Sequence, residues 1–420
     1  MFSYFRIINF GGIFLELINY NEDIKKHPPI DAVINITDAC NLNCDYCFNH
    51  PSPRHMSLQT GINTVKWIIN NFYKLPIEER RNPSISFFGG EPMLRYEELI
   101  IPLMEWADEN IQLPDNFSIS WGMTTNGTLL TKENLRYLSM RKDFSILFSC
   151  DGDAEVQNTH RKTVDGKDSF DLIKENIPIL LKYFPNTVFR ATVTAQTVHK
   201  LFDSYIFAKQ SGFKNFFVMP NCREQWKIED VLELGYQLSN IGRQLYDDII
   251  NQRPLCDYID LSRIMLNWVI KKQTLPFINY RTCGLGCSSV GISANGEITG
   301  CQERNSHDLN EIFYIGDIYT GINEQKHKRL LSSLITEQVA RKNLTFNCDE
   351  CIIRDFCSSR LCVSANYDVS NNLFISSNIN CQWQIMLYEI AQALCELAAI
   401  ENNENFKNWC IQYEQQPLFM

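Results

Sequence analysis

The sequence predicts an α/β protein, in which a partial, TIM-like (β/α)6 barrel is followed by a small cysteine-rich domain. Three observations predict this class. Six strand-like runs alternate with helical patterns between residues 32 and 251. Most of these strands are followed by loops rich in Gly, Asn or Cys, and cysteines cluster again beyond residue 283. A series of βα units is typical of a parallel sheet covered by helices, and 420 residues are too many for one ordinary core.

The predicted elements follow one another with short connections. The expected strands are Ala32–Thr37, Ser84–Phe88, Phe117–Thr124, Phe144–Phe148, Thr187–Thr194 and Asn215–Met219. Helices are expected after an N-cap at Ser57, around Leu99–Trp106, from Thr131, over Ser169–Tyr183, near Ser204–Gln210 and up to about Asn251. The apolar stripes of these segments have helical spacing, so each helix is expected to pack one face on the sheet.

This pattern divides the chain into five segments. The expected segments are an N-terminal β-hairpin (1–29), the barrel (30–252), a helical bridging segment (253–282), the cysteine-rich domain (283–385) and a C-terminal helix (386–420). Gly11-Gly12 lies between two strand-like runs, which favours a hairpin over a leader peptide.

Composition excludes several classes of protein. The formal net charge of −10 argues against non-specific nucleic-acid binding, and no apolar run is long enough to span a membrane. Sixteen cysteines without a signal peptide indicate a reducing cytoplasm, where thiols stay available for metal.

The most informative stretch holds Cys40, Cys44 and Cys47 at the spacing C-x-x-x-C-x-x-C, directly after the first strand. Three thiolates leave one iron of a four-iron cluster without a protein ligand. An open position on a metal is a place where a substrate or cofactor binds. A partial zinc site is the alternative, although no fourth cysteine lies nearby in the sequence.

Three further loops lie in phase with the cysteine loop. Gly89–Pro92, Thr125–Gly127 and Ser149–Gly152 each follow a predicted strand. In barrels of this kind the loops at the carboxyl ends of the strands form the active site. We therefore expect all four loops to meet at one mouth of the barrel.

The second domain carries eight thiols, enough for two fully ligated four-iron clusters. These are Cys283, Cys287, Cys301, Cys348, Cys351, Cys357, Cys362 and Cys381. Cys348-x-x-Cys351 alone could instead be half of a zinc ribbon. The five remaining cysteines, Cys150, Cys222, Cys256, Cys395 and Cys410, are expected to be buried small hydrophobes. Cys150 and Cys222 follow strands toward the mouth, so a role at the mouth is the alternative for these two.

These motifs together resemble the radical SAM superfamily with a C-terminal SPASM domain. The three-cysteine motif followed by Gly-Gly-Glu-Pro carries the first resemblance. Cys283-x12-Gly296-x4-Cys301, Cys-x2-Cys-x5-Cys-x4-Cys and the distal Cys381 carry the second. The resemblance covers Ala32 to Cys381, with one departure: Cys357-x4-Cys362 has four intervening residues where the family usually has three.

The resemblance implies three [4Fe-4S] clusters and S-adenosylmethionine as cofactors. Cys40, Cys44 and Cys47 would ligate the first cluster. Cys283, Cys287, Cys301 and Cys362 would ligate a second cluster, and Cys348, Cys351, Cys357 and Cys381 a third. Tyr46 would lie beside adenine; Gly89, Gly90 and Glu91 would receive the methionyl ammonium; Asn126 and Ser149 would contact ribose or methionine; and Arg161 would pair with the methionyl carboxylate.

The resemblance also implies a reaction. An electron, from a donor such as flavodoxin or ferredoxin, would release a 5′-deoxyadenosyl radical that abstracts a hydrogen from a precursor peptide or protein. The auxiliary clusters would take an electron from the substrate or hold a substrate thiolate.

Two substrates compete. Anaerobic sulfatase-maturating enzymes carry an aspartate base directly after the cysteine that matches Cys301, whereas this chain has Gln302 and then Glu303. An amide cannot take up a proton at neutral pH, so Glu303 would have to serve as the base. We therefore favour a maturase that installs thioether or carbon–carbon cross-links in ribosomally made peptides. The 39 residues before Cys40 are too few for the N-terminal peptide-binding domain of many such enzymes. A non-catalytic zinc-holding scaffold is the alternative of another class.

Overall fold

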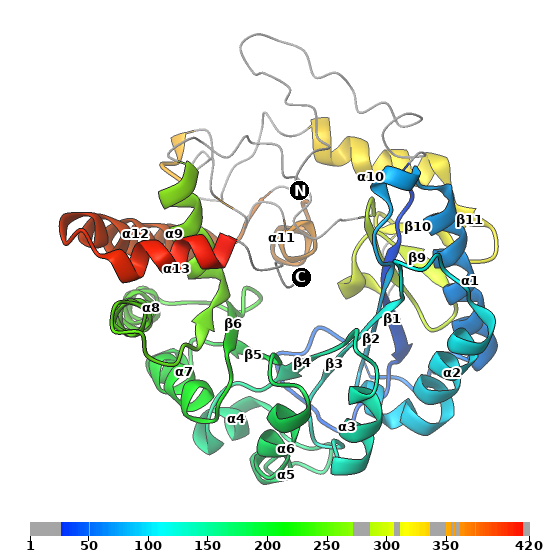
Figure 1. Cartoon of the computed structure of the whole chain (residues 1–420), viewed down its shortest axis with the longest axis horizontal. Helices are drawn as coiled ribbons and strands as arrows, with labels where there is room; N and C mark the ends of the chain where they lie inside the picture. The colour runs from blue at the N-terminus through cyan, green and yellow to red at the C-terminus, as the bar shows by residue number, and fades with distance from the viewer. Residues whose placement is uncertain are drawn as a thin grey trace.

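A computed structural model describes residues 27–49, 51–271, 286–305, 311–336, 350–353, 357, 362–373 and 375–414. The expected N-terminal hairpin lies almost wholly outside these residues, as do Cys283 and Cys348. Figure 1 shows the strands following an arc, with helices along its outer side. The predicted α/β class is confirmed.

The strands form one sheet of eleven, in the order β11-β10-β9-β8-β1-β2-β3-β4-β5-β6-β7. Its central part is the predicted barrel wall, because β1 to β6 run parallel in sequence order. The bounds are β1 Asp31–Thr37, β2 Ser84–Gly89, β3 Ser120–Thr125, β4 Phe144–Ser149, β5 Val188–Val193 and β6 Asn215–Pro220. A short seventh strand, β7 (Asp257–Tyr258), adds to β6 from the expected bridging segment.

The second domain continues this sheet at its other edge. Strand β8 (Ser289–Ile292) pairs in parallel with β1, with Asp31 opposite Ser289. Strands β9 (Glu297–Thr299), β10 (Tyr314–Asp317) and β11 (Gly321–Ile322) then follow as an antiparallel meander. The sequence predicts a separate cysteine-rich domain. In the structure, backbone hydrogen bonds join the first strand of that domain to the barrel.

Helices cover the outer face of the sheet. They are α1 Leu58–Lys74, α2 Ile101–Asn110, α3 Lys132–Ser139, α4 Ala154–His160, α5 Phe170–Lys174, α6 Asn176–Tyr183, α7 Leu201–Gln210 and α8 Ile228–Ile250, with short turns η2 Ile77–Glu79, η3 Pro92–Arg95, η4 Tyr96–Ile100 and η5 Val198–Lys200. Ser57 caps α1 by accepting a hydrogen bond from the Thr60 amide, and Thr131 caps α3 in a capping box. Both predicted helix starts are confirmed.

The single helix expected over Ser169–Tyr183 is wrong. The structure has two short helices, with α5 ending at Lys174 and α6 beginning at Asn176. Pro178 has no amide hydrogen to donate to the carbonyl of Lys174, so a continuous helix would lose that bond.

The remaining helices belong to the C-terminal part. They are α9 Ile259–Lys271, α10 Glu324–Thr336, α11 Val363–Ser370, α12 Asn378–Ile400 and α13 Glu404–Glu414, with the turn η6 Gln302–Arg304. Helix α12 packs on α8, which covers the barrel, and on α9. It begins at Asn378 and contains Cys381, so the expected boundary at residue 386 falls inside a helix. Among the described residues, no helix has the length and apolar character that crossing a membrane requires.

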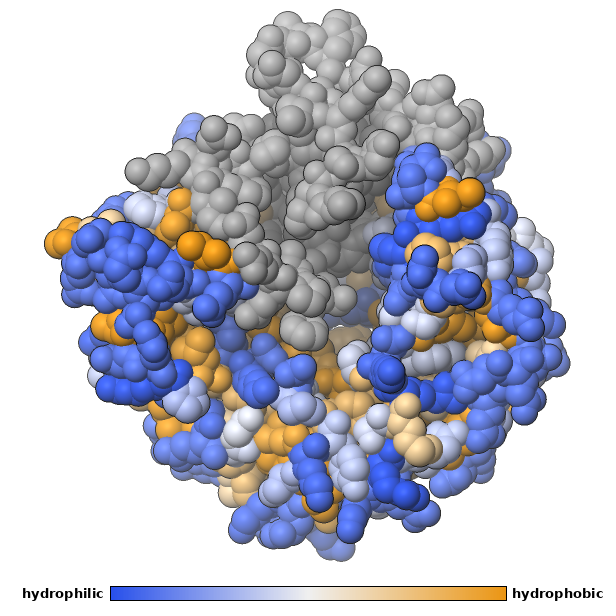
Figure 2. Space-filling model, viewed as in Figure 1, coloured by the Kyte–Doolittle hydropathy of each residue, from blue (hydrophilic) through white to orange (hydrophobic). Residues whose placement is uncertain are grey.

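Alternation along the strands separates an outer from an inner face. On β5 the buried apolar side chains are Phe189, Ala191 and Val193, while Arg190 between the first two is partly exposed. The solvent surface of the covering helices is largely hydrophilic in Figure 2. The apolar residues therefore fill the layer between sheet and helices, and the partly exposed residues face the inside of the barrel.

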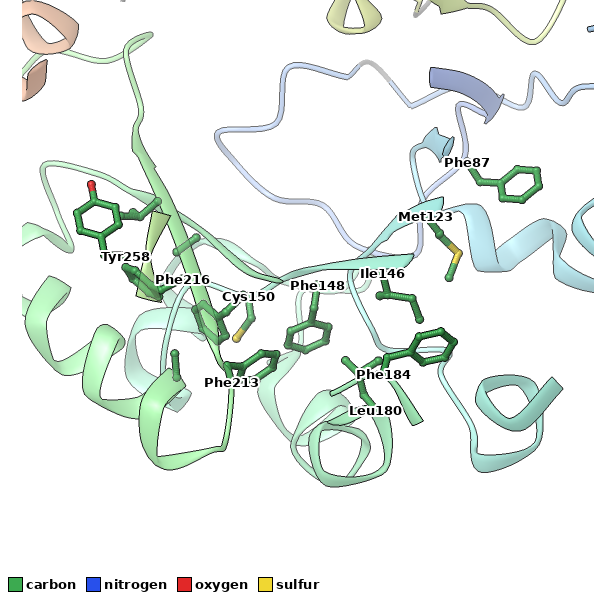
Figure 3. Close-up of a cluster of buried hydrophobic side chains, with 14 of the residues drawn as sticks. Phe87, Met123, Ile146, Phe148, Cys150, Leu180, Phe184, Phe213, Phe216 and Tyr258 are labelled. Atoms are coloured by element: carbon green, nitrogen blue, oxygen red, sulfur yellow. The ribbon is translucent and has the colours of Figure 1, made fainter. Parts of the chain in front are cut away.

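Figure 3 shows part of this outer layer, where Phe148 and Phe213 stack with ring centroids 5.8 Å apart. Cys150 lies in the same layer, is fully buried and donates its S–H to the Gly152 carbonyl at 3.3 Å. The expectation that Cys150 is a buried small hydrophobe is confirmed.

Candidate radical site at the barrel mouth

The three-cysteine loop leaves β1 and is fastened to the loop that follows α4. The Asn43 amide donates to the Lys162 carbonyl at 2.7 Å. The Asp45 carboxylate lies 2.9 Å from Nδ1 of His160, whose Nε2 contacts Thr194 Oγ1 at 2.8 Å. These contacts hold the cysteine loop across the carboxyl ends of β1, β4 and β5, where the sequence predicts the site.

The thiols of this loop fit a metal cluster. Burial raises the pKa of Cys40 to about 11 and that of Cys44 to about 12, and nearby thiols add to both shifts. Cys47 is exposed. Thiolates held together under partial burial repel one another, and bound iron would supply the compensating positive charge. No three Cys, His, Asp or Glu side chains in the described ranges converge as they would around a single metal ion.

The two glycines of Gly89–Pro92 let this loop approach the cysteine loop. Gly90 donates its amide to the Thr37 carbonyl at 2.8 Å. A Cβ on Gly89, whose φ is +136°, would lie 2.1 Å from the Thr37 oxygen, and one on Gly90 would lie 2.1 Å from the Ala39 oxygen. No side chain fits at either position. The predicted contact of these glycines with an ammonium group stays a prediction.

The Glu91 carboxylate is fully buried and joins two of the predicted loops. It accepts hydrogen bonds from the Met93 amide at 3.0 Å, the Thr125 hydroxyl at 2.8 Å and the Asn126 amide at 2.7 Å. Burial raises its pKa to about 7, against these hydrogen bonds. Glu91 thus fixes one loop to another, a role that the sequence pattern does not reveal; its predicted contact with the methionyl ammonium stays a prediction.

Asn126 extends this link to the cysteine loop. Its Nδ2 donates to Asn41 Oδ1 at 3.0 Å and lies 3.9 Å from the Cys40 sulfur. Its Oδ1 accepts from the Thr128 amide at 3.0 Å. The structure therefore brings Cys40, Glu91 and Asn126 together as the sequence predicts.

Arg161 lies beside the cysteine loop and is only 5% exposed, so it is not a solvated surface arginine. Its Nε and Nη2 donate to the two oxygens of Asp151 at 2.9 and 3.1 Å. Its guanidinium lies 5.5 Å from the ring centroid of Tyr46, whose hydroxyl also donates to Asp151. Tyr46, Asp151 and Arg161 thus form one cluster, in which Asp151 and Arg161 are buried. The predicted pairing of Arg161 with a ligand carboxylate would compete with Asp151.

Ser149 ends β4 at the same mouth, where it is partly exposed and lies opposite Arg190 of β5. Its predicted contact with ribose or methionine is compatible with this position and stays a prediction.

Gln302 and Glu303 form the turn η6, which lies against the barrel mouth. The Arg54 guanidinium donates to the Asn305 carbonyl at 3.1 Å, and Asn305 Nδ2 donates to the Val33 carbonyl at 3.2 Å. Gln302 is exposed, whereas Glu303 is half-buried. The turn that carries both candidate residues is therefore attached to β1 and to the segment after the cysteine loop.

Glu303 is held by an ion pair. Its Oε2 lies 3.2 Å from Nη2 of Arg223, which follows β6, and accepts from Ser364 Oγ at 2.9 Å. Arg223 also pairs with Asp368 of α11 and lies 5.3 Å from the ring centroid of Phe48, which follows Cys47. Arg223 thus connects the cysteine loop to the second domain.

The described cysteines of the second domain come from several elements. Cys287 and Cys381 are buried; Cys301, Cys351, Cys357 and Cys362 are half-buried. Cys301 precedes η6 and Cys362 precedes α11, while Cys381 lies in the first turns of α12. Their predicted division into two ligand sets stays a prediction.

Sequence reasoning missed several residues of this site. A local signal marked the region of Asp151 and His160. Asp153 is a good N-cap residue, and it caps α4, the helix that begins just after Asp151 and ends at His160. Arg190 and Arg223 had no such signal in the sequence, because a single arginine in or after a strand is usually interpreted as an ordinary solvated residue.

The chain is similar to known proteins in the region that carries this site. Residues 34–204 match the radical SAM superfamily. These residues form a radical SAM domain. Members of that superfamily use S-adenosylmethionine and a [4Fe-4S] cluster, and the radical SAM domain here contains the cysteine loop, Gly89–Pro92 and Arg161.

Two relatives match a longer region. A cysteine-type anaerobic sulfatase-maturating enzyme from Clostridium perfringens is 29% identical over 253 residues, which cover 57% of this chain and 67% of the relative. A radical SAM cyclopropyl synthase, TigE, from Paramaledivibacter caminithermalis is 23% identical over 286 residues, covering 64% of this chain and 56% of TigE.

Solved structures share the fold beyond the radical SAM domain. The structure of anSMEcpe with bound AdoMet and a Cp18Cys peptide has a TM-score of 0.69 at 22% identity, over 89% of this chain and 99% of that one. SuiB from Streptococcus suis, bound to its precursor peptide SuiA, has a TM-score of 0.57 at 16% identity, over 85% and 76%. The chain therefore shares its fold with these structures beyond the radical SAM domain.

Proposed function

We propose that this protein is a radical SAM/SPASM peptide maturase that cross-links a ribosomally made precursor peptide through a thioether or carbon–carbon bond. The observation that carries the choice of reaction is the environment of Gln302 and Glu303. Neither is a free carboxylate at the position where formylglycine formation would need a base.

Residues of the radical SAM domain would hold the cofactors. Cys40, Cys44 and Cys47 would ligate a [4Fe-4S] cluster, and Tyr46, Asn126 and Ser149 would contact S-adenosylmethionine. When bound, this pair supplies a 5′-deoxyadenosyl radical for hydrogen abstraction. The chain's own part is to orient the ligands: the Glu91 bridge fixes the loops around Cys40, and Asp151 fixes Arg161 beside Cys44.

The second domain would supply two further clusters. Cys283, Cys287, Cys301 and Cys362 would form one ligand set, and Cys348, Cys351, Cys357 and Cys381 the other. We also propose the domain division 30–252, 253–282, 283–385 and 386–420. Strand β8 of the third segment pairs with β1 of the first. A flavodoxin or ferredoxin would deliver electrons.

Gln302 is the residue that separates the two candidate reactions. Its amide has no basic lone pair at neutral pH. Glu303 accepts hydrogen bonds from Arg223 and Ser364, so its carboxylate is already engaged by two partners. Cross-linking removes two hydrogens from the peptide without requiring a carboxylate at this position.

Formylglycine formation is the second candidate, favoured by the relative from Clostridium perfringens and by the fold similarity to anSMEcpe. In that case Glu303 would act as the base after release from Arg223. The arrangement of Glu303 in an ion pair is the reason we place this reaction second.

The test uses anaerobically reconstituted full-length protein with S-adenosylmethionine and dithionite. The first substrate is a sulfatase-derived cysteine peptide, and the second is a small Cys-rich peptide chosen from the open reading frames that neighbour the gene. We expect mass spectrometry to find the second peptide lacking two hydrogens, with an intrapeptide bond, and no aldehyde in the first. Formylglycine in the sulfatase peptide would overturn the proposal.

Metal analysis addresses the scaffold alternative. Three four-iron clusters would give about twelve irons per chain. A colourless protein with stoichiometric zinc and no deoxyadenosine formation would contradict every radical function proposed here.

A further inference from the structure

Arg190 places a positive charge inside the barrel. Its neighbours on β5, Phe189 and Ala191, are buried on the outer face, where the Phe189 ring packs on Phe207 of α7 with centroids 6.2 Å apart. Arg190 points to the opposite side, and its Nη1 donates to Thr192 Oγ1 at 2.7 Å, two residues along the same face. Its guanidinium therefore lies on the inner face, near the mouth.

The nearby carboxylates are already engaged. Asp151 receives two hydrogen bonds from Arg161, and its oxygens also accept from the Tyr46 hydroxyl and the Thr192 amide, the latter at 2.9 Å. Glu303, which also acts electrostatically on Arg190, is bound to Arg223. Over the described ranges no carboxylate forms an ion pair with Arg190.

Together with Arg190, the cluster of Tyr46, Asp151 and Arg161 thus has two guanidinium groups and one carboxylate. Burial and the neighbouring Arg161 lower the pKa of Arg190, as expected for a cation that lacks a counter-ion. A charged group inside the barrel that lacks a counter-ion is costly, and an anion that binds beside it lowers that cost. A planar guanidinium matches the two oxygens of a carboxylate.

We propose that Arg190, with Thr192 beside it, is a carboxylate-binding subsite inside the barrel. The inference rests on the proposed function, which provides two sources of that group: the methionyl end of S-adenosylmethionine and an acidic residue of the peptide. Arg161 would then orient Asp151 and Tyr46, and Arg190 would contact the ligand.

Binding to the reconstituted holoenzyme tests the subsite without reference to turnover. In the first arm, S-adenosylmethionine and its decarboxylated analogue are titrated into wild type, Arg190→Gln and Arg190→Lys. Wild type should prefer the carboxylate-bearing ligand by about tenfold or more, the size expected for a charge-assisted hydrogen bond. Arg190→Gln should lose this preference, and Arg190→Lys should keep part of it. Arg253→Gln, at an exposed site, is the matched control.

A second arm distinguishes the source. N-acetylglutamate amide and N-acetylglutamine amide are titrated into the S-adenosylmethionine-loaded enzyme. If the cofactor preference survives in Arg190→Gln but a preference for the glutamate probe is lost, the carboxylate comes from the peptide. If Arg190→Gln changes neither preference, the subsite is wrong.

Labelling of wild-type protein guards against misfolding of the variants. Phenylglyoxal should modify Arg190, and the carboxylate-bearing ligand should protect it while its neutral analogue does not. Equal protection by both would also overturn the inference. Because these are binding measurements, a failure of cross-linking activity would leave the result for Arg190 intact.

Discussion

The Glu91 carboxylate accepts a hydrogen bond from the backbone amide of Asn126 at 2.7 Å, so that a residue following β2 fixes the loop following β3. Replacement of Glu91 by Gln places an NH2 group against one of three donors. We expect Glu91→Gln to lower the free energy of unfolding by about 1–3 kcal/mol and to weaken binding of S-adenosylmethionine. Urea unfolding and equilibrium dialysis measure the two effects.

The control for Glu91 is Glu98→Gln, because Glu98 has a side chain 66% exposed in an ion pair with Arg95. That variant should unfold like wild type. Equal stability of Glu91→Gln and Glu98→Gln would show that the buried bridge contributes nothing.

Cys40 and Cys150 make a matched pair for metal removal. Cys40→Ala should cost about four irons per chain and abolish deoxyadenosine formation, because the first cluster loses a ligand. Cys150→Ala should keep full iron, since the Cys150 thiol lies in the apolar layer outside the barrel. Iron analysis and chromatography of deoxyadenosine check both; wild-type iron in Cys40→Ala would refute the ligand assignment.

Arg223 holds the turn that carries Gln302. Arg223→Met removes the ion pairs with Glu303 and Asp368, while Arg223→Lys keeps the charge but loses the planar contact with Phe48. We expect Arg223→Met to lose about 1–2 kcal/mol of stability and Arg223→Lys to lose less. Hydrogen exchange of residues 301–305 should quicken in the same order; unchanged exchange in Arg223→Met would mean that other contacts hold the turn.

Asp257 of β7 makes stability depend on pH. Burial raises its pKa to about 6, although Ser262 and Tyr413 donate hydrogen bonds to it. A carboxyl group whose folded pKa is raised above the unfolded value of about 3.9 stabilises the fold below that value, and this contribution is lost as pH rises through 6. The stability of Asp257→Asn relative to wild type, measured by thermal unfolding, should therefore increase between pH 5 and pH 7.5.

The expected gain is about 1–1.5 kcal/mol, because pH 5 lies about one unit below the folded pKa of Asp257 and one pKa unit corresponds to roughly 1.4 kcal/mol. Taking the difference between the two proteins at each pH removes the effects of other titrating groups. Parallel pH profiles for wild type and Asp257→Asn would contradict the assignment.

The sequence predicts what local chemistry determines. The hydroxyls of Ser57 and Thr131 accept hydrogen bonds from backbone amides three residues further along, and these caps start two helices. The cysteine loop follows β1 because the residues before it form a strand. The two-helix region around Pro178 also had a local signal, which a purely periodic reading overlooked.

What the sequence does not reveal depends on distant partners. Arg161 was expected to pair with a ligand carboxylate. Its hydrogen bonds with Asp151 could not be predicted, because they depend on how the strand ends come together. Arg190 looks like any strand residue until its neighbours show which face is buried. The β1–β8 pairing joins residues far apart in the chain, and alternation of polar and apolar residues specifies no partner strand.

That pairing has a consequence for synthesis. Asp31 lies opposite Ser289, and these residues are 258 positions apart. At 5–20 residues per second, the ribosome needs about 13–50 s to produce the second after the first. During that time one edge of the nascent barrel presents unpaired amides and carbonyls, the kind of edge that pairs with other chains. Truncation before Ser289 would make this edge permanent, so a radical SAM domain expressed alone should aggregate.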